Sequence, residues 1–186
     1  MNLKQWWSSI STIGPLFGYH PNAAKTCLVV RNEQEEAAKE IFDGTGINIT
    51  TEGKKHLGAP LGSPSFVEDF VTCKVKEWTE EVEKLAAVAG SQPQAAYAVF
   101  VHGTKTKWNY ICRTILNCSH LLQPLEDSSH QILIPALSGG RPPCSNIERD
   151  LLALPTKLGG MSLSNPTVTA ESEFDASKEV TAPLVE

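Results

Sequence analysis

Three residues near the middle of the chain, Cys112, Cys118 and His120, are of types that bind metal ions. A structural zinc site needs four thiolate or imidazole ligands at short, regular spacings. The pattern Cys-x5-Cys-x-His supplies three, and no fourth candidate follows at a comparable spacing. We therefore expect buried thiols beside an exposed histidine here, and neither a metal site nor a cofactor in this chain.

The rest of the sequence holds no complete residue set for a common type of catalysis. It lacks a Gly-x-Ser-x-Gly motif, a Walker phosphate loop, a dinucleotide-binding glycine pattern and a His-Glu-x-x-His motif. The other histidines are scattered, and no nucleophile is paired with them in the sequence: His20, His56, His102 and His130. One lysine, Lys25, lies between a turn-rich loop and an apolar stretch, where its ammonium group can reach a phosphate. The alternative is a solvated lysine before an edge strand.

A basic segment interrupts an otherwise acidic chain. The formal net charge is −5, yet residues 91–120 contain Lys105, Lys107 and Arg113 and no acidic residue. A polyanion responds to the local potential rather than to the total charge. Together with Trp108 and Tyr110, these cations predict a weak, salt-sensitive nucleic-acid surface. The alternative places the aromatic rings in the core, which we expect for Trp108, and the charges in water.

The first 63 residues mix helical and strand patterns. Apolar residues at helical spacing predict a helix over 1–13, which Gly14 and Pro15 end. The remaining expected elements are a strand at 27–31, a helix from 32 to 43, a strand at 47–51, and a strand at 54–57 that pairs with it across a Glu52-Gly53 turn.

From residue 64 onward the pattern is helical. Over 65–89, apolar residues recur every three or four positions, which predicts a long helix with a buried stripe. A groove for a partner helix is the alternative for that stripe. Further helices are expected at 93–103, 104–117, 121–137 and 146–153. The fold class is thus α+β, predominantly α: a partial sheet and hairpin (1–63), a helical bundle (64–165) and an acidic tail or fraying helix (166–186).

The location follows from segments that the sequence lacks. No apolar run approaches the ~18 residues of a membrane span, and no secretory signal is visible. Five irregularly spaced cysteines favour reduced thiols over a disulfide framework. We expect an intracellular protein, cytoplasmic or nuclear, without a membrane partner.

Two short segments resemble the end of the palm subdomain of retroelement reverse transcriptases. These are Gly14–Val30, with Asn-Ala-Ala-Lys-Thr leading into a strand, and His56–Gly62, with its Leu-Gly pair. In that family the first corresponds to the fourth palm motif and the second to the primer-grip hairpin. Further matches resemble the thumb and beyond: Trp78, Gln123–Asp127, Glu148–Pro155 and Leu158–Gly160.

The resemblance implies a retrotransposon fragment of an RNA-directed DNA polymerase. It implies that Lys25 approaches the phosphates of the incoming nucleotide and acts as a general acid. It also implies that Leu57, Gly58 and Gly62 let a primer strand come close, the alternative being an ordinary glycine-bearing turn. Nucleic acid (template–primer) and the missing N-terminal polymerase portion are the implied partners.

The family's catalytic aspartates belong to motifs N-terminal to this segment, and no Asp-Asp pair occurs here. Polymerase chemistry needs such carboxylates to hold two Mg²⁺ ions, so we expect Mg²⁺ only with the complete enzyme and no polymerisation by this chain alone. Two alternatives stay open. One is a stand-alone helical protein-interaction module that uses Trp6, Trp7 and the long helix, and the other is a non-functional remnant of a transposable element.

Overall fold

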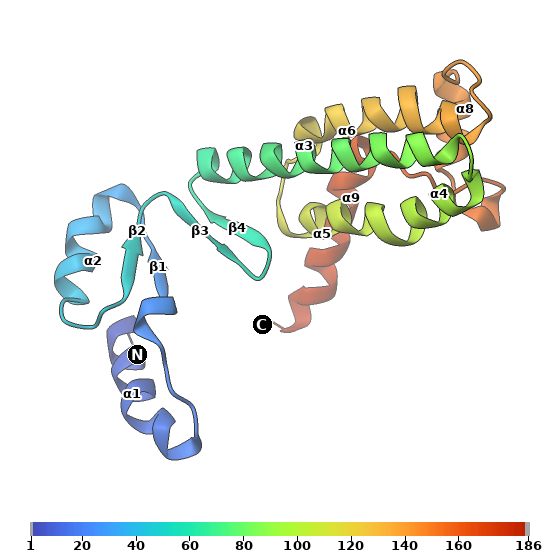
Figure 1. The fold of residues 1–186 in the computed structure, drawn as a ribbon. Coiled ribbons are helices and arrows are strands. Elements are labelled where there is room, and N and C mark those ends of the chain that lie inside the picture. The colour runs from blue at the N-terminus through green and yellow to red at the C-terminus, as the bar shows by residue number, and fades with distance from the viewer. Residues whose placement is uncertain (1, 185–186) are drawn as a thin grey trace. The chain divides into compact units, whose positions relative to one another are not determined.

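The computed structural model describes residues 2–184. These residues divide into two compact units, with the boundary between Val67 and Glu68. The fold is α+β and predominantly α, as the sequence predicts (Figure 1). Within residues 2–184, no helix combines the length and the apolar character needed to cross a membrane. We call the two parts the N-terminal and the C-terminal unit.

The N-terminal unit contains a parallel strand pair, an antiparallel hairpin and two helices. Its elements are α1 (Leu3–Ile13), β1 (Cys27–Val29), α2 (Glu35–Ile41), β2 (Asn48–Thr50), β3 (Gly53–His56) and β4 (Ala59–Gly62). Asn2 and Gln5 form a reciprocal capping box at the start of α1, which explains why the helix begins there. Strand β1 pairs in parallel with β2, with Leu28 opposite Ile49.

The predicted hairpin partner of 47–51 is wrong. Strand β2 pairs with β1, and β3 pairs instead with β4, so the hairpin turns at Leu57 and Gly58. Both residues have positive φ, 47° and 95°, the pattern of a type I′ turn, which matches the twist of the two strands. The Glu52-Gly53 step leads into the hairpin rather than forming its turn.

The C-terminal unit is a bundle of helices. It comprises α3 (Pro64–Ala89, whose first turn precedes the boundary), α4 (Pro93–Val99), α5 (Lys105–Thr114), α6 (Gln123–Ser128), α7 (Ile134–Leu137), α8 (Asn146–Ala153) and α9 (Pro166–Thr181). π-helical turns, Phe100–Thr104 and Ser129–Leu133, join α4 to α5 and α6 to α7.

The predicted stripe of the long helix is core. Val71, Val75, Trp78, Val82 and Ala89 of the predicted stripe are buried. Its other members, Val67 and Leu85, are half-buried, and Ala86 beside Leu85 is buried although it was not predicted. Trp108 is buried too, as expected, and its ring lies 6.2 Å from that of Trp78 and 5.7 Å from that of Phe100. The stripe is therefore not a groove for a partner helix, because this unit's own residues cover it.

The helix break predicted at Gly103 is wrong. Gly103 does not end a helix: the backbone stays helical at Thr104 and Lys105, and α4 continues into α5 through the π-helical turn (Figure 1). Burial of Phe100 and Trp108 on either side outweighs the roughly 1 kcal/mol that a helical glycine costs. Of the two alternatives for 166–186, a helix is correct over residues 166–181 and an acidic tail is wrong there, since α9 packs against α5 and buries Ala170. Residues 185–186 lie outside the described part of the chain.

Candidate nucleic-acid interface

Lys25 is held on a short, well-anchored turn of the N-terminal unit. The Asn22 side chain accepts a hydrogen bond from the Lys25 N–H at 3.2 Å, and the Thr26 hydroxyl donates to the Asn22 carbonyl at 2.9 Å. The Asn48 amide, at the start of β2, donates to the Ala24 carbonyl at 2.8 Å. Asn22 and Thr26 thus fix the backbone, while the Lys25 side chain is exposed and forms no ion pair with any residue in 2–184.

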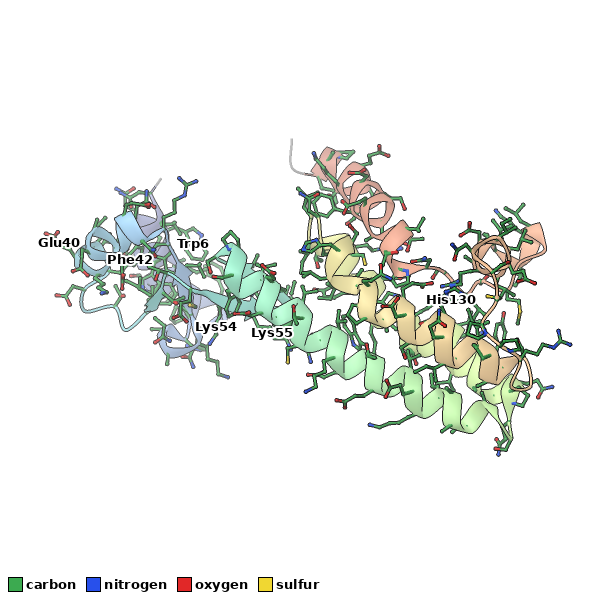
Figure 2. All side chains as sticks on the ribbon, turned by 90° about the horizontal axis from the view of Figure 1, so that it is seen from above. Trp6, Glu40, Phe42, Lys54, Lys55 and His130 are labelled. Atoms are coloured by element: carbon green, nitrogen blue, oxygen red, sulfur yellow. The ribbon has the colours of Figure 1, made fainter. Side chains whose placement is uncertain are left out.

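The β3–β4 hairpin presents basic residues in water. Lys54, Lys55 and His56 are consecutive exposed residues of β3, and Figure 2 labels the two lysines. The Leu57 side chain at the turn is 83% exposed. Successive side chains of a strand point to opposite faces, so the two lysines extend the positive charge to both faces of the ribbon. A two-stranded ribbon of this kind is narrow enough to follow a nucleic-acid groove.

The hairpin itself requires the glycines at Gly58 and Gly62. Gly58 occupies a positive-φ position of the turn. Gly62 lies opposite Gly53, and a Cβ on Gly62 would collide with the carbonyl oxygen of Glu52 and the Cα of Gly53. Gly58 is thus explained by the backbone conformation of the turn, and Gly62 by the close approach of the hairpin's own backbone. The sequence pattern did not separate these causes from the approach of a primer strand.

The basic residues of α5 are paired with groups from other parts of the C-terminal unit. Lys107 contacts Glu81 of α3 at 2.6 Å, and Arg113 contacts Glu173 of α9 at 2.6 Å. Lys105 donates to the Ser162 carbonyl at 3.1 Å, and burial lowers its pKa, opposed by the charge of Glu173. The acid-free segment of the sequence is therefore a charge-balanced surface in space. Tyr110 lies on the same helix with 41% of its surface exposed.

The two cysteines of α5 and the following loop form a buried pair. Cys112 and Cys118 are both buried, whereas His120 is exposed. A hydrogen bond with the Cys118 thiol, reinforced by burial, raises the pKa of Cys112 far above its usual range, so this thiol stays protonated at neutral pH. In the described part of the chain, no three His, Cys, Asp or Glu side chains are grouped so that they could hold a metal ion.

Two features of the fold carry no signal in the sequence. One is a buried ion pair in the C-terminal unit, Arg149 of α8 with Glu126 of α6. The other is a groove of about 910 Å³ between α1 and α2 of the N-terminal unit. Neither could be found from spacing, because the partners are more than twenty residues apart and only the fold brings them together.

The sites predicted from the sequence thus fall in both units. Lys25 and the hairpin belong to the N-terminal unit, and the α5 residues belong to the C-terminal unit. Exposed lysines on a fixed backbone can neutralise phosphates, which is the chemistry that this arrangement offers. No protein-family model, curated protein or solved structure matches the chain.

Proposed function

We propose that this chain is the C-terminal palm-edge and thumb region of a retroelement reverse transcriptase, which contacts nucleic acid and does not polymerise alone. The proposal rests on the motif resemblance and on one structural observation. A two-residue hairpin turns at the Leu-Gly pair and carries Lys54, Lys55 and His56 on its exposed strand. A small α+β unit containing the hairpin precedes a helical bundle, the order expected of palm edge and thumb. The proposed setting is intracellular, cytoplasmic or nuclear.

The hairpin is a better candidate for phosphate contact than α5. Lys107 and Arg113 are each already within 2.6 Å of a carboxylate, which lowers the positive potential that a phosphate would meet. Lys54 of β3 is exposed and forms no ion pair with any residue in 2–184. We therefore assign the main contact to the exposed hairpin strand, through Lys54 and its neighbour Lys55, with Lys25 as a further candidate.

The binding test uses the full chain and a fluorescent RNA–DNA duplex. Each phosphate neutralised on a duplex contributes about 0.9 to the slope of log affinity against log salt. Two lysines then account for a roughly tenfold loss of affinity between about 50 and about 200 mM salt. We expect Lys54→Glu/Lys55→Glu to remove the binding seen by anisotropy at low salt.

The matched control is Lys76→Glu/Lys84→Glu on the exposed face of α3, which changes the net charge by the same amount. It should lower the affinity only slightly. An equal loss in both double variants would show that the binding follows overall charge and not the hairpin, and an affinity that ignores salt would overturn the phosphate contact. With Mg²⁺, a template–primer and deoxynucleotides, the chain should extend no primer, and measurable incorporation would refute the proposal.

A further inference from the structure

Cys112 and Cys118 meet in the interior of the C-terminal unit, although an exposed loop separates them in sequence. Cys112 lies in the last turn of α5, and Cys118 directly precedes the 3₁₀-helical turn Ser119–Leu122. The two cysteines are 1% and 2% exposed, whereas Leu116 between them is 55% exposed. The chain therefore leaves the core after α5, turns at the surface and brings the second sulfur back to the first.

The ends of this loop are held, and its middle is free to adjust. Helix α9 packs against α5 and against Ser119–Leu122. Asn117 has a φ of 57°, the left-handed conformation that asparagine adopts more readily than most residues, and it is exposed. The two thiols share a hydrogen bond. A disulfide requires this contact to shorten to about 2.05 Å between the sulfurs, and the surface loop is the part of the chain that can move to allow it.

The hydrogen bond gives the two sulfurs different reactivity. The Cys112 thiol donates to the Cys118 sulfur and lowers the pKa of Cys118, while burial and the charge of Glu171 oppose this effect. The pKa of Cys112 is raised, as described above. The thiolate and not the thiol is the nucleophile, so Cys118 is the sulfur that reacts first and Cys112 keeps its proton for a second step.

We propose that Cys112 and Cys118 are a redox-sensitive dithiol, which hydrogen peroxide converts to a disulfide. The Cys118 thiolate attacks one peroxide oxygen, the O–O bond breaks, and the leaving hydroxide takes up the proton that Cys118 had released. The Cys112 sulfur then attacks the sulfenic acid on Cys118, forms the S–S bond and gives its proton to the departing hydroxide. Two electrons pass from the thiols to one peroxide, and two waters form. A dithiol reductant reverses the change.

The burial of both sulfurs selects a small oxidant. Hydrogen peroxide reaches them through local opening of the exposed loop, which requires less free energy than unfolding of the whole unit. The disulfide then ties the end of α5 to Ser119–Leu122, so this corner of the bundle opens less in the oxidised chain. The inference concerns the C-terminal unit alone and is independent of the contact proposed for the β3–β4 hairpin.

The first test uses the full chain without any substitution. Hydrogen peroxide is added to the native chain, the remaining thiols are blocked, and the tryptic peptides are analysed by mass spectrometry without reduction. Trypsin cuts after Lys107 and Arg113, so Cys112 and Cys118 fall in different peptides that stay joined only through a disulfide. We expect this joined pair, and we expect dithiothreitol to separate it. No joined pair in the native chain, or one that forms only after unfolding in urea, would overturn the proposal.

Two variants then separate the roles of the sulfurs. Both are made in a Cys27→Ser/Cys73→Ser/Cys144→Ser background, which removes the exposed and half-buried thiols. Cys112→Ser should stop at a sulfenic acid on Cys118, which dimedone labels, because the serine hydroxyl still donates the hydrogen bond. Cys118→Ser should be labelled at Cys112 at least about tenfold more slowly, the ratio of thiolate that one pKa unit gives. Equal labelling would refute the assigned roles, and so would sulfinic acid on Cys118 in place of the disulfide when Cys112 is present. The peptide analysis of the unsubstituted chain keeps the test valid if a serine variant fails to fold.

Discussion

The buried ion pair of the C-terminal unit provides a quantitative test of how its helices are held together. Arg149 donates from Nε to Oε1 of Glu126 and from Nη2 to Oε2, both at 2.7 Å. Its Nη1 donates to the Leu163 carbonyl at 2.6 Å and its Nη2 to the Ser164 carbonyl at 3.4 Å. The two charged side chains are only 4% and 7% exposed. One guanidinium therefore connects α8, α6 and the segment before α9.

The perturbation is the removal of one partner or of both. Glu126→Leu leaves a buried guanidinium without its counter-charge, which costs about 3–5 kcal/mol of unfolding free energy. Arg149→Met leaves the carboxylate unpaired and costs about as much. The double variant removes both charges and leaves mainly the Leu163 and Ser164 carbonyls without donors, at about 1–3 kcal/mol. We expect the double variant to be more stable than either single variant.

The assay is urea unfolding in a Trp6→Phe/Trp7→Phe background, in which fluorescence reports only Trp78 and Trp108 of the C-terminal unit. Arg141→Met is the matched control, because Arg141 is exposed, and it should change the free energy by less than about 0.5 kcal/mol. The reasoning is refuted if either single variant lowers the free energy of unfolding by less than about 1 kcal/mol. It is also refuted if the double variant lowers that free energy by the sum of the two single effects.

Three further predictions concern single positions. Gly103→Ala should stabilise the C-terminal unit by about 1 kcal/mol in the same urea assay, because a Cβ there meets no atom within 4 Å in a continuous helix. A lower free energy of unfolding in this variant would instead support a helix end at Gly103. Leu57→Asn should raise the free energy of opening of the β3–β4 hairpin by about 1–2 kcal/mol, since leucine is strained at a φ of 47° and asparagine is not. The hairpin amides should then exchange their hydrogens more slowly, and faster exchange would contradict the turn assignment. Hydrogen bonds from the Ser145 N–H and then its hydroxyl lower the pKa of Glu148 below its ordinary value of 4.5. The carboxylate therefore stabilises the fold above that value, and the deficit of Glu148→Gln in thermal unfolding at neutral pH should close as the pH falls through the lowered pKa; a pH-independent deficit would show another cause.

Local patterns predicted the elements well where one periodicity dominates. The four- and three-residue steps from Val71 to Ala89 correctly marked the buried face of α3, because helix periodicity and burial depend on residues close in sequence. The helix end predicted at Gly103 was wrong because there the outcome depends on tertiary packing rather than on local sequence. A glycine signals a break in isolation, but the burial of Phe100 and Trp108 keeps the helix intact.

Strand pairing was harder to predict than strand position. The strands at 27–31 and 47–51 were expected and both exist in shortened form, yet the partner assigned to 47–51 was wrong. A short apolar strand can pair in more than one way, and the choice depends on contacts far away in sequence. The turn at Leu57 was hidden because leucine rarely occupies a positive-φ position.

The charges of the candidate site were also hard to predict, because they depend on contacts between residues that are distant in sequence. Counting charges along the sequence marked Lys107 and Arg113 as a basic surface, yet Glu81 and Glu173, 26 and 60 residues away, lie against them. Lys54 and Lys55 are adjacent in sequence on an exposed ribbon, so folding does not separate them. Charge reversal at Lys54 is therefore the cleaner experiment, because Lys54 forms no ion pair with any residue in 2–184. Reversal of Lys107 or Arg113 also breaks an ion pair between helices, and a loss of binding there would mix the loss of a phosphate contact with a change in the fold.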